Sequence, residues 1–108
     1  MPETGIIAVI EDPFIRKLLR DILTRHGYAV REATVHHAIE MLGAGPEHVN
    51  LLITNTPEEF LLFSGVLPLL YLAAAPDLEL AARFKHCRTV RKPFHTDELL
   101  AAIRELTN

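Results

Sequence analysis

Two adjacent carboxylic acids, Glu11 and Asp12, are the first residues along the chain whose types could do chemistry. They follow a continuous apolar run at Ile6–Ile10 and precede Pro13. Hard oxygen ligands of this kind suit Mg²⁺, which could in turn recruit a phosphoryl group. Asp12 before a proline also fits a helix N-cap, and for Asp12 alone this capping role is sufficient. Glu11 is the residue that capping does not explain.

The same junction excludes one large class of binding site. A dinucleotide site or a P-loop needs glycines and bare backbone N–H groups where the first strand meets its helix, because the ligand there is an anion. Glu11 and Asp12 would repel a phosphate at this position. We therefore expect no nucleotide site of either kind.

Other clusters of chemically active side chains have simpler explanations. His36 and His37 are adjacent and point to different sides of a helix, so they are poor joint metal ligands. His86 and Cys87 resemble a soft-metal pair, but two ligands without further spaced partners do not make a zinc site. Because no Ser-His-acid, Cys-His or complete metal constellation is visible, an independent enzyme is the least favoured class.

Strand-length apolar runs alternate with segments of helical period. The runs predict five strands, at Ile6–Ile10, Tyr28–Glu32, Val49–Thr54, Pro68–Leu72 and Thr89–Arg91. A first helix is predicted from Asp12 to Gly27, with apolar positions Phe14, Ile15, Leu18, Leu19, Ile22 and Leu23. A second helix is predicted from the Thr34 cap to a break at Gly43, Gly45 and Pro46. A third is predicted over Pro76–Lys85. A closing helix is marked by the apolar residues Leu99, Leu100, Ile103 and Leu106. This alternation predicts right-handed crossovers and a doubly wound parallel sheet.

Size and composition predict one globular domain over residues 1–108, with 49% hydrophobic and 23% charged residues. Cys87 is the only cysteine, which fits a reducing compartment. Met1–Gly5 lacks the pattern of a signal peptide, and no apolar run is long enough to span a membrane. A net charge of -3 gives no general attraction to nucleic acid or anionic lipid. We expect a cytoplasmic protein with neither nucleic acid nor membrane as its partner.

In open parallel sheets the working groups gather at the carboxyl ends of the strands, where the loops converge. This rule points to residues at four strand ends. They are Glu11 and Asp12 after the first strand, Asn55 after the third, Ala73 after the fourth, and Lys92 with Pro93 after the fifth.

The residues that carry a family resemblance span nearly the whole chain. They are Ile7 to Asp12 with Pro13, Ile15, Arg16, Leu18 and Leu19, then Gly27, Tyr28 and Val30, then Leu51 to Asn55, and finally Lys92, Pro93, Phe94, Glu98 and Leu99. This ordered set resembles the response-regulator receiver domain. The resemblance implies a flavodoxin-like three-layer sandwich with a five-stranded parallel sheet of order 2-1-3-4-5, and phosphotransfer to an aspartate after the third strand. It also implies a cis peptide bond between Lys92 and Pro93. The peptide bond before a proline prefers the trans form by much less than other peptide bonds do.

Asn55 stands where the resemblance places the phospho-accepting aspartate. Phosphotransfer needs an anionic oxygen nucleophile, and the asparagine amide is neutral. The replacement also removes one ligand from the implied metal site, which leaves Glu11 and Asp12 with a weaker hold on Mg²⁺. We therefore expect a chain that requires no cofactor and binds Mg²⁺ weakly at most.

Ala73 is a second departure, at the position where the family carries a threonine or serine that hydrogen-bonds the phosphoryl oxygen. A methyl group cannot make that bond. Lys92 is retained, and in the family it would pair with the phosphoryl group. Without a phosphoryl group, we expect Lys92 to pair with Asp12 or Glu11 and to keep those acids compensated.

The connection between the third and fourth strands, Thr56–Leu67, is twelve residues long. A complete parallel crossover usually needs at least about 10 to 12 residues, so a shortened or missing third helix is expected, with one or two turns within Pro57–Phe63. The segment is too apolar for an exposed loop, and we expect it to press onto the sheet or onto another chain. A well-packed short loop explains it equally well. If the crossover bares the sheet, a homodimer is expected.

Two groups of residues are therefore candidates for a protein interface. The first is apolar and lies in the short crossover: Phe60, Leu61 and Phe63. The second belongs to the local basic concentration, Arg83, Lys85, Arg88, Arg91 and Lys92, in which Arg88 and Arg91 are the interface candidates. Acidic side chains of a partner could meet this patch, although a solvated surface is the commoner explanation.

The sequence thus favours a pseudo-receiver of a two-component phosphorelay pathway that binds a histidine kinase or an output protein by constitutive contacts and is not an enzyme. Two alternatives stay open. One is a receiver that takes phosphate on another residue or responds to phosphate or a small ligand, with residual Mg²⁺-dependent phosphoryl binding. The other is a ligand-binding module that uses the vacated third-helix region as a pocket.

Overall fold

Five parallel strands form the central layer in the computed structural model, which describes residues 6–45 and 48–107. The strands are β1 (Ile6–Ile10), β2 (Ala29–Glu32), β3 (Val49–Thr54), β4 (Leu69–Ala73) and β5 (Cys87–Arg91), in the order β2-β1-β3-β4-β5. Every neighbouring pair is parallel, which confirms the predicted flavodoxin-like sheet. The predictions for Met1–Gly5 and for Pro46 lie outside the described residues.

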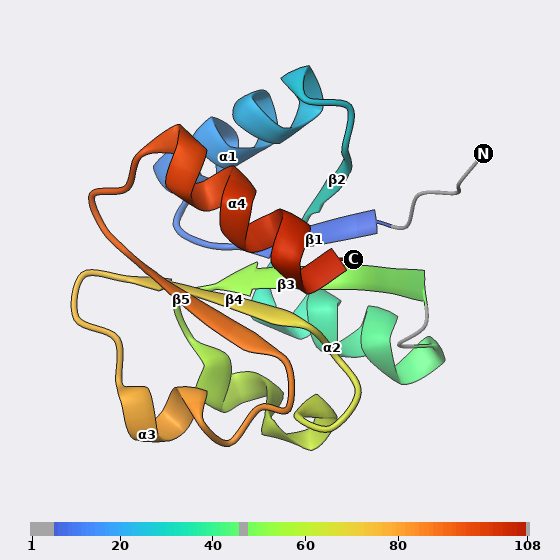
Figure 1. The fold of residues 1–108 in the computed structure, drawn as a ribbon. Helices are drawn as coiled ribbons and strands as arrows, with labels where there is room; N and C mark the ends of the chain where they lie inside the picture. The colour runs from blue at the N-terminus through green and yellow to red at the C-terminus, as the bar shows by residue number, and fades with distance from the viewer. Residues whose placement is uncertain (1–5, 46–47, 108) are drawn as a thin grey trace.

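Helices cover both faces of this sheet (Figure 1). On one face lie α1 (Pro13–Arg25) and α4 (Thr96–Thr107), and on the other lie α2 (Val35–Ala44), the 3-10 helix η2 (Pro57–Phe63) and the short α3 (Leu78–Ala81). Each face has its own cluster of buried apolar side chains. None of the described helices is both long enough and apolar enough to cross a membrane.

Helix α1 begins and ends where its sequence predicts. Asp12 is the N-cap, because its Oδ1 accepts from two backbone N–H groups of the first turn at 3.0 and 3.1 Å, and Pro13 follows it. Leu19 and Leu23 are fully buried against the sheet. Gly27 ends the segment with a positive φ of 88°, a conformation that glycine adopts without strain.

The crossover between β3 and β4 contains no full helix, as predicted, and η2 occupies its place. Phe60 of η2 is 0% exposed and packs in the same buried cluster as Leu52 and Leu69 of the sheet. The expectation that this segment presses onto the sheet is therefore confirmed, and the bare sheet face on which the homodimer expectation depended is not present at Phe60. The burial of Phe60 also contradicts its prediction as an interface residue, whereas Leu61 and Phe63 are half-buried.

Helix α3 is much shorter than the predicted Pro76–Lys85. It starts at the Asp77 cap, whose Oδ1 accepts from the backbone N–H groups of Glu79 and Leu80. It ends after Ala81 because the chain must turn toward β5: Phe84 is buried in the core, and the backbone N–H of Lys85 donates to the carbonyl of Ser64 at 2.9 Å. Helical composition is overridden here by tertiary contacts.

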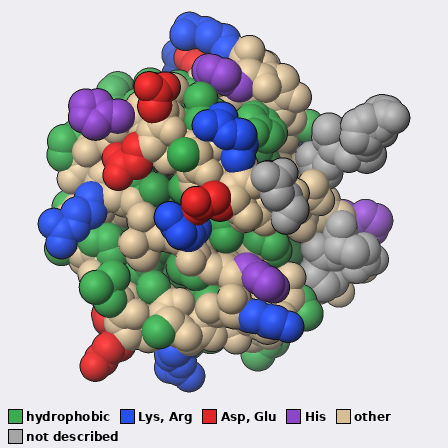
Figure 2. Space-filling view, in the orientation of Figure 1, with side chains coloured by type: hydrophobic (Ala, Val, Ile, Leu, Met, Phe, Trp, Pro, Cys, Tyr) green, Lys and Arg blue, Asp and Glu red, His purple; other side chains and the backbone are tan. Residues whose placement is uncertain are grey.

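The surface mixes side chains of every kind. In the face shown in Figure 2, hydrophobic side chains reach the surface between charged side chains of both signs. Six large apolar side chains are exposed in the part of the chain that the structure describes: Phe14, Leu18, Ile39, Leu62, Val66 and Leu78. These exposed positions matter for partner binding, since single apolar residues on a surface are ordinary but neighbouring ones are informative.

Candidate functional site

Strand register brings the first two candidate positions together. Ile10 at the end of β1 pairs with Thr54 at the end of β3. Glu11 and Asn55 are the next residues on these neighbouring strands, so they occupy equivalent positions at the carboxyl edge of the sheet. The predicted juxtaposition of the acidic pair with residue 55 is consistent with this register.

The other two candidates lie at the ends of β4 and β5. Ala73 pairs with Arg91 in the sheet, and the backbone N–H of Lys92 donates to the Ala73 carbonyl at 2.9 Å. The Lys92–Pro93 peptide bond is cis, as the resemblance implies. All four strand ends β1, β3, β4 and β5 thus contribute a candidate residue to one edge.

An ion pair spans this edge. The Nζ of Lys92 donates to the Oε1 of Glu11 at 3.0 Å. The Glu11 side chain is 0% exposed and that of Lys92 is 22% exposed. The sequence left the partner of Lys92 open between two acids, and the structure assigns it to Glu11.

Glu11 is a buried acid with incomplete compensation. Burial raises the pKa of its carboxyl above the ordinary value of 4.5, and the Lys92 ammonium and the backbone N–H of Asp12 oppose that rise. The N–H of Asp12 donates to Oε1 at 3.3 Å. The second oxygen, Oε2, is buried and accepts no hydrogen bond from the described residues. An uncompensated buried oxygen of this kind costs free energy when the carboxyl is ionised.

Asp12 caps helix α1. Its Oδ1 accepts hydrogen bonds from the first turn of α1, and its side chain is exposed. The capping explanation is thereby satisfied for Asp12, and the two adjacent acids have different environments: one buried against Lys92, the other at the surface.

Thr54 is a site residue that sequence reasoning missed. Its side chain is fully buried, its Oγ1 accepts from the backbone N–H of Thr56 at 3.0 Å, and its hydroxyl shares a hydrogen bond with that of Thr56 at 3.2 Å. This local turn fixes the chain immediately around the exposed Asn55. A threonine ending a buried apolar run was the available signal.

The residues at this edge supply fewer charged ligands than the Mg²⁺ site that the resemblance implies. Glu11 has Oε1 on Lys92, Asp12 has Oδ1 on the helix, and Asn55 offers a neutral oxygen where a carboxylate is implied. Within residues 6–45 and 48–107, no three His, Cys, Asp or Glu side chains form a group that could hold a metal ion.

Solved structures of other proteins share this architecture, although sequence comparison finds no relative. No family model and no curated protein matches the chain. The signal receiver domain of an HD domain-containing protein from Pseudomonas fluorescens has a TM-score of 0.79 and 20% identity, with 99% of this chain and 89% of that chain covered. The chain has the receiver-domain fold.

Two more solved structures agree on this fold. The chemotaxis response regulator CheY4 of Vibrio cholerae has a TM-score of 0.72 and 16% identity, covering 97% of this chain and 99% of that one. A response regulator receiver protein from Sinorhizobium medicae has a TM-score of 0.73 and 20% identity, covering 97% and 94%. Identities this low establish the fold alone.

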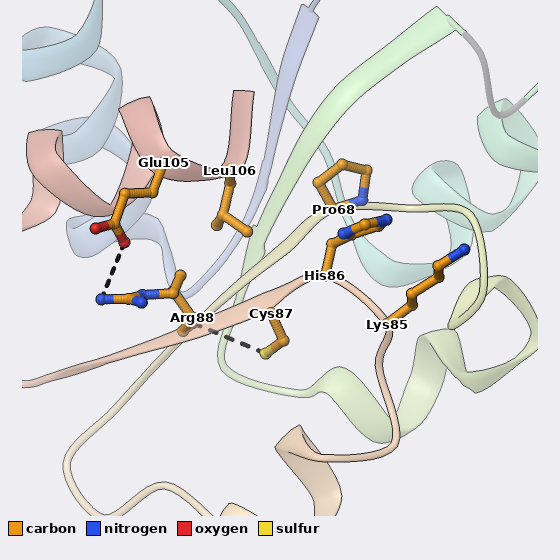
Figure 3. A pocket seen from close by; sticks show the side chains of 7 residues that line it. All are labelled: Pro68, Lys85, His86, Cys87, Arg88, Glu105 and Leu106. Atoms are coloured by element: carbon orange, nitrogen blue, oxygen red, sulfur yellow. Dashed lines mark hydrogen bonds and ion pairs between the residues drawn. The ribbon is translucent and has the colours of Figure 1, made fainter. Parts of the chain in front are cut away.

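The basic residues near β5 do not form one patch on this receiver fold. Neighbouring strand residues face opposite sides of a sheet: Cys87 packs toward the α2 side, and Arg88 reaches α4, where it pairs with Glu105 at 2.9 Å. Figure 3 shows Lys85 extending away from the Arg88–Glu105 pair, around a depression of about 560 Å³. Arg88 and Arg91 are both exposed, but the odd spacing between them places them on opposite faces of β5.

An apolar groove of about 600 Å³ lies beside the site. We call it the α1 groove, and its lining is Phe14, Ile15, Leu18 and Ile22 of α1 with Ala74, Lys92, Pro93, Phe94 and Thr96. Lys92 is the one charged residue in that lining. The groove therefore adjoins the Glu11–Lys92 pair, which connects a surface feature of the receiver fold with its buried acid.

Proposed function

We propose that this chain is a receiver-type signalling domain that acts through protein contacts and accepts no phosphoryl group at Asn55. The fold supports a place in a two-component pathway, since the solved structures that resemble it include signal receiver domains and response regulators. The observation that carries the rest is the pairing of Lys92 with buried Glu11 beside a neutral residue 55.

The chemistry at residue 55 is the first support. Transfer of a phosphoryl group requires an oxygen nucleophile with available electron density, and the Asn55 nitrogen lone pair is delocalised into its carbonyl. Ala73 supplies a methyl group and no hydroxyl to hold a phosphoryl oxygen. Acceptor and hydrogen-bond donor are thus both missing from the positions at which the resemblance places them.

The ion pair is the second support. A phosphoryl group at this edge would need a cation, and the Lys92 ammonium is already 3.0 Å from Glu11. Withdrawing Lys92 would leave the Glu11 carboxylate buried without its partner, at a cost of several kcal/mol for an uncompensated buried charge. We infer that the pair holds the edge in one arrangement, so the domain works by its shape.

The partners of such a domain are proteins of the pathway, a histidine kinase or an output protein, in the cytoplasm. No catalytic activity and no required cofactor belong to this proposal. Self-association through a bare sheet face is not part of it either, because Phe60 of η2 fills that face.

The test is phosphorylation by acetyl phosphate in the presence of Mg²⁺, read by intact-protein mass spectrometry. The wild-type chain is expected to keep its mass. The double variant Asn55→Asp/Ala73→Thr restores acceptor and hydroxyl, and it serves as the positive control for reagent and detection. A wild-type adduct of one phosphoryl mass that hydroxylamine removes would overturn the proposal.

One observation favours a second candidate, a receiver that still binds a phosphoryl group non-covalently with Mg²⁺. The Oε2 of Glu11 is buried and has no hydrogen-bond partner among the described residues, so it could accept an additional ligand. Isothermal titration with Mg²⁺, with and without inorganic phosphate, separates the candidates. Saturable binding that Glu11→Gln abolishes supports the second, and the absence of heat supports the first.

A further inference from the structure

We propose that the turn over residues 54–56 protects Asn55 from deamidation and so keeps residue 55 neutral as the protein ages. The inference rests on the proposed function, in which the absence of a carboxylate at this position keeps the domain from accepting a phosphoryl group. It gives buried Thr54 the role of a positioning residue, whose hydroxyl holds the backbone nitrogen that would otherwise attack the Asn55 side chain.

The reaction to be prevented is the slow conversion of asparagine to aspartate in water, a known weakness of this residue type at high temperature. It begins when the backbone nitrogen of Thr56 attacks Cγ of Asn55. A bond forms between that nitrogen and Cγ, the bond from Cγ to the side-chain nitrogen breaks, and ammonia leaves with the proton that Thr56 gives up. Water then opens the cyclic imide at either of its carbonyl carbons, which gives aspartate or isoaspartate.

The attacking nitrogen is held by a hydrogen bond. The backbone N–H of Thr56 donates to Oγ1 of Thr54 at 3.0 Å, and the two threonine hydroxyls share a further hydrogen bond at 3.2 Å. Thr54 is 0% exposed, so its hydroxyl is fixed in the fold. The nitrogen can attack only after it turns toward Cγ and gives up its proton, and both changes break the hydrogen bond to Thr54.

The strand before Asn55 resists the rotation that the attack needs. Thr54 is the last residue of β3, a central strand, and it pairs with Ile10 of β1 on one side and with Tyr71 of β4 on the other. A residue paired on both sides cannot turn without disturbing both neighbouring strands. The peptide on the amino side of Asn55 is therefore fixed by the sheet.

The chain after Asn55 is restrained as well. The Thr56 carbonyl accepts from the backbone N–H of Glu59 at 3.1 Å, so both backbone groups of Thr56 are engaged. Pro57 follows and is buried, and a residue that precedes proline has a restricted backbone. The peptide bond between Asn55 and Thr56 thus lies between two anchored residues.

Burial of Asn55 itself offers no protection. Its side chain is exposed, so water is available to open an imide once the imide has formed. The step that the fold can slow is therefore ring closure, which depends on the Thr56 nitrogen. Asn50 is also exposed but lies near the start of β3, and it provides an internal reference within the same chain.

The consequence of losing this protection would be chemical as well as electrostatic. Aspartate at residue 55 would add a carboxylate to the edge that already holds buried Glu11, whose compensation by Lys92 is incomplete. It would also restore the oxygen nucleophile that the amide lacks. An ageing sample would then become a mixture of neutral and acidic molecules.

The test compares Thr54→Val, which keeps the branched shape but removes the hydroxyl, with Thr54→Ser, which keeps the hydroxyl but removes the methyl group. The intact folded proteins are incubated in ¹⁸O-labelled water at mildly alkaline pH, and peptide fragmentation reads the conversion at Asn55 and at Asn50. Thr54→Val is expected to raise the rate at Asn55 by about fivefold, the population change that loss of one ordinary hydrogen bond produces. Thr54→Ser should stay close to the wild-type rate, and Asn50 should react equally in all three proteins.

Hydrogen exchange gives a second readout on the same proteins. The amide of Thr56 should exchange faster in Thr54→Val by about the same factor, because exchange also requires this N–H to be released. If Thr54→Val does not fold, wild type in urea replaces it. Unfolding removes the hydrogen bond and should raise the rate at Asn55 by at least about fivefold.

Three results would overturn the inference: an Asn55 rate that neither Thr54→Val nor unfolding raises, an equal increase in Thr54→Ser, and an equal increase at Asn50 in Thr54→Val. The second would show that packing at Thr54 matters rather than its hydroxyl, and the third would show a general loosening of β3. None of these rates involves acetyl phosphate. A wild-type chain that accepts a phosphoryl group would overturn the proposed function and leave the rates as they are, so the two failures are distinguishable.

Discussion

Lys92 and Glu11 connect the ends of β5 and β1, two strands that β3 and β4 separate in the sheet. Their 3.0 Å contact joins residues that are 81 positions apart in the chain. The pair closes the carboxyl edge of the sheet over a carboxylate with no exposed surface.

Lys92→Met is expected to lower the free energy of unfolding by about 3 kcal/mol at neutral pH, because it leaves Glu11 buried without its cation. The loss should shrink in acid, where Glu11 is protonated with or without its partner. Urea unfolding at both pH values measures it. Lys17→Met removes an exposed lysine from α1 and should change stability by less than about 0.5 kcal/mol. An equal loss at both pH values would mean that Lys92 contributes packing rather than charge.

The pKa of Glu11 gives a stability profile whose sign can be worked out. Since burial raises this pKa above 4.5 in the folded state, the folded chain binds the proton more tightly than the unfolded chain does. The resulting stability is fully present below pH 4.5 and is lost as the pH rises through the folded-state pKa. The free energy of unfolding of the wild type, minus that of Glu11→Gln, should therefore decrease with rising pH above this value. A difference that increases with pH would show that Lys92 outweighs burial.

Phe60 and Leu62 provide a matched pair within η2. Phe60→Ala should cost about 3 to 5 kcal/mol, since the side chain is 0% exposed in the core. Leu62→Ala should cost less than about 0.5 kcal/mol, because that side chain is 91% exposed. Thermal or urea unfolding compares them. Equal costs would show that the short crossover does not insert into the core.

Asn55→Asp should tighten Mg²⁺ binding by about tenfold, because it adds a carboxylate beside Glu11 at the end of the neighbouring strand. Asn50→Asp adds the same charge near the start of β3, also at an exposed position, and should leave the affinity unchanged. Calorimetric titration measures both. An identical gain for the two variants would mean that the effect comes from net charge alone. It would also mean that residue 55 does not lie beside the acidic edge.

Much of the fold was predictable because the central strands are rich in apolar residues. Ile6–Ile10 is a continuous apolar run and Val49–Thr54 is apolar at four of its six positions, and the structure confirms both strands with the predicted bounds. The predicted Pro76–Lys85 helix was wrong in length, since the burial of Phe84 and the hydrogen bond from Lys85 to Ser64 depend on contacts with η2 that local sequence does not contain.

The site was predictable in its residues and less so in its contacts. Two adjacent acids gave no basis for choosing the partner of Lys92, because the choice depends on which side chain turns into the fold. The α1 groove was hidden for a related reason. Phe14 and Leu18 follow the same helical period as the buried Leu19 and Leu23, and only the packed structure shows that they remain exposed. Six apolar positions in one helix, more than one stripe can bury, were the available signal.

The central claim is that the Glu11–Lys92 edge is fixed and does not respond to a phosphoryl group. The most direct test is the two-dimensional ¹⁵N–¹H spectrum of the labelled chain, recorded before and after addition of acetyl phosphate with Mg²⁺. The account predicts unchanged amide resonances for Glu11, Asn55 and Lys92, and for the strands that carry them. Saturable shifts at these residues would contradict it, whether the phosphoryl group were bound covalently or not.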